Sequence, residues 1–233
     1  MSAPLRTACL FVLAGALLAP AASAQDTVVP PDIKRTRGHL VPDVELIAAD
    51  STTFRFAILQ GKPIIVSPIF TSCPHTCSYI TSSLRDALAE IGEPGVGYEV
   101  LTVSFDPADG PAQLRDYKER LELPDGWRLA VATPENLAAL LGAIDFQYAA
   151  MEEGGFAHAN VITILDPEMK VASYLHGVMY ETAALRKELE RAARNASLVR
   201  KARPLLLVLA ALGLLVMISV LVATGRKRRP AAA

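Results

Sequence analysis

The chain has 233 residues, 52% of them hydrophobic, a formal net charge of −1 at pH 7 and only three cysteines. This length accommodates one domain of ordinary size with additional segments, and the near-neutral charge gives no argument for a nucleic-acid-binding protein. Apolar stretches near both ends place the chain among exported, membrane-linked proteins.

The N-terminal stretch predicts a signal peptide over residues 1–24. Arg6 precedes an apolar run at residues 8–19, and the small residues at 22–24 have the pattern of a cleavage site. Cys9 lies within this leader, so the mature protein is expected to retain two cysteines. Export would place both of them in an oxidising compartment.

Residues 25–40, which contain prolines and a glycine, are expected to be a linker, and residues 41–196 the globular domain. Strands are expected at residues 43–47, 52–56, 63–70, 98–105, 128–132, 146–150, 161–165 and 170–175. Helices are expected at residues 78–91, 111–121, 135–141 and 182–196. Strands and helices alternate early and a hairpin comes late, which predicts an α/β domain with a thioredoxin-like three-layer architecture.

Cys73 and Cys77 directly follow the apolar run at residues 63–70. Pro74 suits the first turn of a helix, so we expect a buried strand that leads into a helix opening with two thiols. The helix N-terminus favours thiolate, which is the nucleophilic and metal-binding form. At positions i and i+4 both sulfurs share one helix face, so they can bind one metal ion or form a disulfide.

The alternative for this pair is a purely structural disulfide. A bond between Cys73 and Cys77 would close a very short loop, which removes little entropy from the unfolded chain. Redox helices of the thioredoxin type usually have two residues between their cysteines, and here there are three. The spacing therefore favours a metal site over a structural bond.

The C-terminal region predicts a membrane anchor. Residues 205–223 contain no charge and are long enough to cross a bilayer, so we expect a transmembrane helix over residues 204–224. The basic tail at residues 225–233 is expected to be cytoplasmic. Together with the leader, this predicts a bacterial inner-membrane protein with a single C-terminal span and its soluble domain in the periplasm.

Four stretches in this order resemble the Sco/SenC family, the copper-binding thioredoxin-like proteins of cytochrome c oxidase assembly. They are the cysteine motif at residues 70–77, the stretch Val-Ser-Phe-Asp-Pro-Ala-Asp at residues 103–109 with Leu114 and Tyr117 after it, which resembles the family's S-x-D-P-x-x-D segment, the strand opened by Trp127, and the His-strand-Asp-Pro segment at residues 157–167. Two departures are Ser78, where the family commonly has proline, and the C-terminal anchor, where family members usually have an N-terminal one.

The resemblance implies a copper ion held by Cys73, Cys77 and His158. Thiolates select Cu(I) and imidazole suits copper in either state, so the chemistry agrees. His158 is expected in a loop before the strand at residues 161–165. The other histidines are expected to be exposed or in turns and linker: His75, His176 and His39. Asp106 and Asp109 are expected to help receive a metal or partner, or to form a turn and helix cap before Pro111.

The sequence is compatible with two main functions. The first is a metallochaperone that delivers copper to the apo copper-site subunit of cytochrome c oxidase or to another copper protein. The second is a thiol–disulfide oxidoreductase, in which Cys73 attacks a partner's cysteines and Cys77 resolves. A peroxidase is a weaker third function, because paired cysteines favour the other two. His158 discriminates between the first two, since only a metal site requires it.

Overall fold

A single sheet of seven strands organises the domain. The computed structural model describes residues 28–74, 76–194, 207–215 and 217. Across the sheet the strands are β2 (Thr53–Arg55), β1 (Glu45–Ala48), β5 (Trp127–Val131), β4 (Glu99–Ser104), β3 (Ile64–Ile69), β8 (Val161–Leu165) and β9 (Val171–His176). The three strands β3, β4 and β5 are parallel, and the remaining pairs are antiparallel.

The central strands are buried along their whole length. Every residue of β3, β4 and β8 is buried, which matches the continuous apolar runs expected of strands covered on both faces. The cysteines follow β3, so they emerge at the edge of the core rather than from a surface loop.

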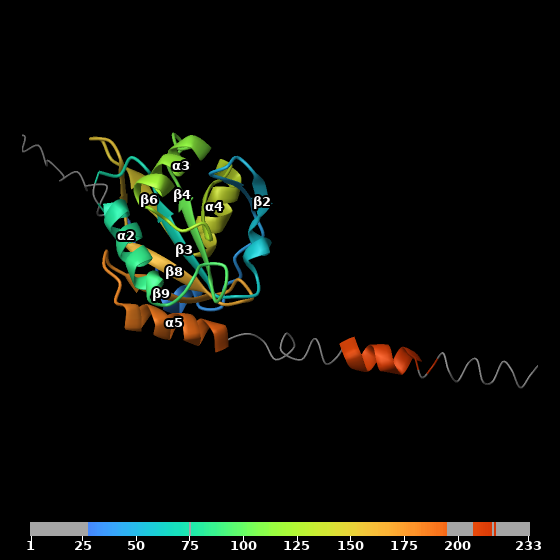
Figure 1. The fold of residues 1–233 in the computed structure, drawn as a ribbon. Helices are drawn as coiled ribbons and strands as arrows, with labels where there is room; N and C mark the ends of the chain where they lie inside the picture. The colour runs from blue at the N-terminus through green and yellow to red at the C-terminus, as the bar shows by residue number, and fades with distance from the viewer. Residues whose placement is uncertain (1–27, 75, 195–206, 216, 218–233) are drawn as a thin grey trace, which may run out of the picture.

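Helices cover the two faces of this sheet (Figure 1). On one face, α2 (Thr76–Ala89) contacts both α3 (Pro111–Arg120) and α5 (Thr182–Arg194). On the other lies α4 (Pro134–Ala143), with the short helix α1 (Ile33–Thr36) near its C-terminal end. A 3₁₀ turn, η2, spans Phe56–Leu59. This three-layer arrangement confirms the thioredoxin-like α/β fold.

A small hairpin stands apart from the central sheet. It pairs β6 (Tyr148–Ala150) with β7 (Phe156–His158), and Tyr148 lies opposite His158 in the register. Two glycines with positive φ angles, Gly154 and Gly155, make the turn. The expectation that His158 lies in a loop is wrong: it is the last residue of β7. The missed strand is three residues long and contains only one alternation of its side chains, so it carries little periodic signal.

The segment expected to be a linker contributes to the fold. Within it, α1 contacts β9, Thr36 is buried, and Leu40 forms a β-bridge with Lys170. The remaining strands and helices agree with the expected ranges to within a few residues.

About half of the expected anchor lies outside the described residues. Of residues 204–224, only 207–215 and 217 are described, and they are helical. Within the part of the chain that the structure describes, no helix has both the length and the apolar character needed to cross a bilayer. The leader at residues 1–24 and the tail at residues 225–233 also lie outside it.

Candidate functional site

The two thiols meet at the N-terminal end of α2. Cys73 lies in the turn after β3, and Cys77 is the second residue of the helix. The backbone N–H of Cys77 donates to the Sγ of Cys73 at 3.4 Å, and the hydroxyl of Thr76 lies 3.5 Å from the same sulfur. Neither cysteine forms a disulfide within the described residues. The sulfur of Cys73 therefore takes the place of a capping oxygen at a helix N-terminus. His75 lies outside the described residues.

The two thiols differ in burial. Cys77 is 1% exposed, whereas Cys73 is half-buried. Burial raises the pKa of the Cys77 thiol well above its ordinary value, so this thiol stays protonated at neutral pH. A helix N-terminus alone predicts the opposite direction, and here the loss of solvent outweighs it. A metal ion that binds Cys77 must release its proton.

A buried tyrosine supports the first turn of α2. The hydroxyl of Tyr117, on α3, donates to the carbonyl oxygen of Cys77 at 3.0 Å and lies 2.8 Å from the hydroxyl of Thr81. Tyr117 is fully buried. Because this pair of bonds joins α3 to the helix that carries the cysteines, the backbone position of Cys77 is fixed from a second element.

Two aspartates hold the loop that leads to Cys73. Asp109 accepts hydrogen bonds from the backbone N–H of Thr71 (2.8 Å), from the Thr71 hydroxyl and from the Ser104 hydroxyl. Asp106 accepts from the hydroxyl of Ser72 in this loop at 3.4 Å and from the N–H of Ala108 at 2.9 Å. The segment after β4 therefore acts as a brace for the cysteine loop. Of the roles expected for these aspartates, the structure shows the one in the turn.

The N-terminus of α3 is capped differently from the expectation. Its N-cap residue is Gly110, whose N–H donates to the side-chain oxygen of Gln113 at 3.0 Å. Pro111 is the first helical residue, as a proline at this position favours. The oxygens of Asp109 bind backward to Thr71 and Ser104 instead of forward to the helix.

His158 lies in a cluster of aromatic rings. Its ring centroid is 5.4 Å from that of Phe105 and 5.9 Å from those of Phe70 and Phe146. Burial among these rings lowers the pKa of the imidazole, which favours the neutral form. Its Nδ1 lies 3.1 Å from the carbonyl oxygen of Ala159. Because a carbonyl only accepts, this contact places the proton on Nδ1 and leaves the Nε2 lone pair available.

One cavity joins the helix opening to the histidine. It has a volume of about 380 Å³, and Thr76, Met151 and His158 are among the residues that line it. In the described part of the chain, however, no three Cys, His, Asp or Glu side chains lie close enough together to hold a metal ion. The structure thus places Cys73 and Cys77 at the start of α2, and His158 on a cavity that Thr76 of the same helix also lines, without completing a metal site.

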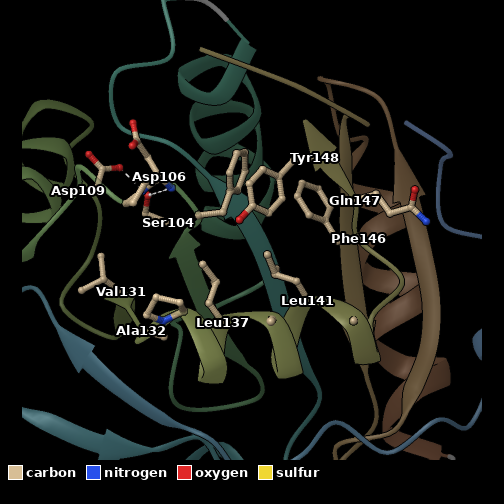
Figure 2. A pocket seen from close by; sticks show the side chains of 15 residues that line it. Ser104, Asp106, Asp109, Val131, Ala132, Leu137, Leu141, Phe146, Gln147 and Tyr148 are labelled. Carbon is tan, nitrogen blue, oxygen red and sulfur yellow. Dashed lines mark hydrogen bonds between the residues drawn. The ribbon is translucent and has the colours of Figure 1, made fainter. Parts of the chain in front are cut away.

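A second, larger cavity lies beside the aromatic cluster. It measures about 620 Å³ and opens between the end of β4 and helix α4 (Figure 2). The carboxylates of Asp106 and Asp109 stand at one side, the ring of Tyr148 at the other, and Leu137 and Leu141 project from α4. Neither thiol nor His158 lines it. The larger cavity is therefore separate from the reactive groups, although Phe105 borders both regions.

The donor set is chemically suited to copper. Two thiols and one imidazole are soft and borderline ligands that bind copper in preference to magnesium or calcium. That Cys73, Cys77 and His158 are the copper ligands remains a prediction from the sequence. The supporting roles of Thr71, Ser104 and Tyr117 were not predicted, since each depends on a contact between distant segments.

Comparisons with known proteins agree with this geometry. A family model described as SCO1/SenC matches residues 33–194. A comparison with curated proteins gives no match. Among solved structures, a protein of Aquifex aeolicus VF5, described as a candidate electron transfer protein, shares 34% identity at a TM-score of 0.66. The alignment covers 70% of this chain and 98% of that one.

More distant structures share the fold. Arabidopsis thaliana ScoI with copper bound aligns at 23% identity and a TM-score of 0.57, covering 66% of this chain and 98% of its own. BsSco, described with a disulfide switch and as a member of the Sco family of cytochrome c oxidase assembly proteins, aligns at 19% identity and a TM-score of 0.56, covering 71% and 96%. With a family model that matches more than half of its length, the chain belongs to the SCO1/SenC family.

Proposed function

We propose that this chain is a membrane-anchored copper-binding protein that delivers copper to, or prepares, the copper site of cytochrome c oxidase. The observation that carries the proposal is the thiol pair at the opening of α2, beside a cavity that His158 lines. Two thiolates and an imidazole suit copper in both oxidation states. Membership of the family and the copper bound to the Arabidopsis relative support the proposal.

In this function copper is cargo, and delivery proceeds by ligand exchange. Cysteines of the acceptor protein replace the ligands of this chain one at a time, so no free copper is released. Cys73 is the first ligand to be replaced, because it is half-buried while Cys77 is buried. The acceptor is the apo copper-site subunit of cytochrome c oxidase or another copper protein.

The proposal includes a location. The leader at residues 1–24 directs the chain across the bacterial inner membrane, and the apolar segment at residues 204–224 anchors it there. The domain then faces the periplasm, where it meets an acceptor attached to the same membrane.

A second function, thiol–disulfide exchange, is favoured by the inequality of the two thiols. The accessible Cys73 attacks a partner disulfide and forms a mixed disulfide, with the partner's other sulfur leaving as thiolate. Cys77 then displaces the partner from Cys73, which leaves the partner reduced and this chain with a Cys73–Cys77 disulfide. The disulfide switch described for BsSco supports thiol–disulfide exchange as the second function.

A copper titration of the reduced full chain tests the first function. We expect one copper per chain, with a thiolate-to-Cu(II) charge-transfer band in the visible. His158→Ala should weaken Cu(II) binding more than Cu(I) binding, because two thiolates alone can hold Cu(I). The same change should alter the thiol reduction potential less, since exchange depends mainly on the two sulfurs.

Two outcomes decide against this site or this function. If Cys73→Ser or Cys77→Ser binds copper as tightly as the parent, the proposed ligands are wrong. In cells, His158→Ala should impair oxidase assembly, and added copper should partly restore it. Full assembly with this variant at low copper would reject delivery and favour thiol–disulfide exchange.

A further inference from the structure

Among the described residues that line the His158 cavity, Met151 alone has a soft donor atom that the proposed site does not use. It follows β6 directly and opens the turn to β7. Its N–H donates to the carbonyl oxygen of Gly155 at 3.1 Å, and the N–H of Gly154 donates to its carbonyl oxygen at 3.1 Å. These two bonds fix the backbone of Met151 at the base of a tight turn.

The end of its side chain lies beside the strand that leads to the cysteines. The Met151 methyl carbon and a ring carbon of Phe70 stand 3.8 and 3.7 Å from the point where a Cβ at Gly155 would be. Phe70 is the third residue before Cys73, and its ring also contacts that of His158 at 5.9 Å. The end of the Met151 side chain and the ring of Phe70 therefore both border Gly155, on the side of the hairpin that faces His158's aromatic neighbour.

The same cavity connects the Met151 side chain to His158 and to the first residue of the cysteine helix. Met151 and His158 line it from the hairpin, and Thr76 lines it from α2, with its hydroxyl 3.5 Å from the sulfur of Cys73. The hairpin β6–β7 forms its own two-stranded sheet. Met151 and His158 both belong to this hairpin. An approach of the hairpin to α2 would therefore bring the thioether and the imidazole toward the thiols at the same time.

We propose that the Sδ of Met151 is a fourth donor for the copper bound by Cys73, Cys77 and His158. This inference rests on the proposed function and adds a ligand to it. A thioether is a neutral, soft ligand, so it stabilises Cu(I) more than Cu(II) and adds no charge to a site with two thiolates. Met151 thereby sets the oxidation state that the site prefers.

The ordinary alternative is that Met151 only fills space against an aromatic ring, which methionine does well. Met151→Leu separates the two roles, because it keeps the approximate volume and removes the sulfur. The matched control is Met179→Leu, which alters a side chain that is 81% exposed and lies outside this cavity.

The test uses the reduced full chain and competition with a chromophoric Cu(I) chelator. We expect Met151→Leu to weaken Cu(I) binding about tenfold and Cu(II) binding much less, which lowers the Cu(II)/Cu(I) potential by about 59 mV per tenfold difference. X-ray absorption of the Cu(I) form should lose one sulfur neighbour. Met179→Leu should match the parent in all three measurements.

Selenomethionine labelling provides a second measurement that needs no mutation. A copper neighbour in the selenium absorption spectrum of the Cu(I)-loaded chain supports the inference even if Met151→Leu folds poorly. The inference is overturned if no such neighbour appears, or if Met151→Leu equals the parent while Cys73→Ser abolishes binding; the proposed function then stands. If the parent itself binds no copper, the function fails together with the inference.

Discussion

Asp109 lies one loop away from the cysteines and still determines the path of the chain toward them. Its carboxylate accepts hydrogen bonds from the N–H and hydroxyl of Thr71 and from the hydroxyl of Ser104. Thr71 precedes Cys73 by two residues, and Ser104 is the last residue of β4. One side chain therefore joins the cysteine turn to the central sheet.

Asp109→Ala should reduce the free energy of unfolding by about 2 kcal/mol, because it removes the acceptor from three donors in a half-buried place. Urea unfolding of the reduced chain measures the change. Asp106→Ala is the control, with an expected loss below about 1 kcal/mol, since Asp106 is bound mainly by the N–H of Ala108. Equal losses in both variants would show that Asp109 has no special bracing role.

At the scale of elements, the cysteine helix is held at both ends by tyrosines from neighbouring elements. Tyr117 of α3 binds the carbonyl of Cys77 near the start of α2. Tyr98, directly before β4, donates its hydroxyl to the carbonyl of Gly92 after the helix ends. The position of the thiols thus depends on the packing of α2 against α3 and against the segment that leads into β4.

Tyr98 gives this packing a dependence on pH. Burial raises the pKa of its phenol to about 12 in the folded state, whereas the unfolded chain has the ordinary value of about 10. The unfolded state loses its proton first, so this contribution to stability is complete below pH 10 and decreases as pH rises toward 12. Urea midpoints between these pH values should fall for the parent.

Tyr98→Phe is the matched variant for this effect. It removes the ionising group, so its midpoint should fall less steeply over the same pH interval, although other buried tyrosines remain. Its stability at neutral pH should be lower, because the carbonyl of Gly92 loses its donor. Identical alkaline slopes in the parent and Tyr98→Phe would contradict the assignment.

At the scale of the whole molecule, the family match and the three-layer domain coincide. The match covers residues 33–194, from the first residue of α1 to the last of α5. All four proposed copper donors lie within it. The segments outside it carry the proposed location of the domain, which is tested separately from the copper chemistry.

We expect residues 25–203 outside the cytoplasm and residues 226–233 inside, because an exported chain that returns through one apolar span ends on the cytoplasmic side. A reporter that is active only in the cytoplasm should therefore work when fused after Ala233. The paired fusion ends near Asn195 and should be inactive. Activity of this second fusion, with silence of the first, would reverse the proposed orientation.

The sequence by itself predicted the parts of this protein that depend on neighbours along the chain. The buried strands appear as continuous apolar runs, and Cys73 and Cys77 follow one of them at the start of a helix. Four local motifs in order sufficed for the family. These features can be predicted from the sequence because periodicity, helix starts and motif spacing are properties of residues close together in the chain.

The tertiary structure alone decided the environment of the reactive groups. The bond from Thr71 to Asp109 spans 38 residues, and that from Tyr117 to Cys77 spans 40. Burial gives Cys77 a raised pKa where the helix N-terminus alone predicts a lowered one. His158 lies among rings from three other segments. Solvent exclusion and long-range contacts arise only when distant segments pack, so no local pattern encodes them.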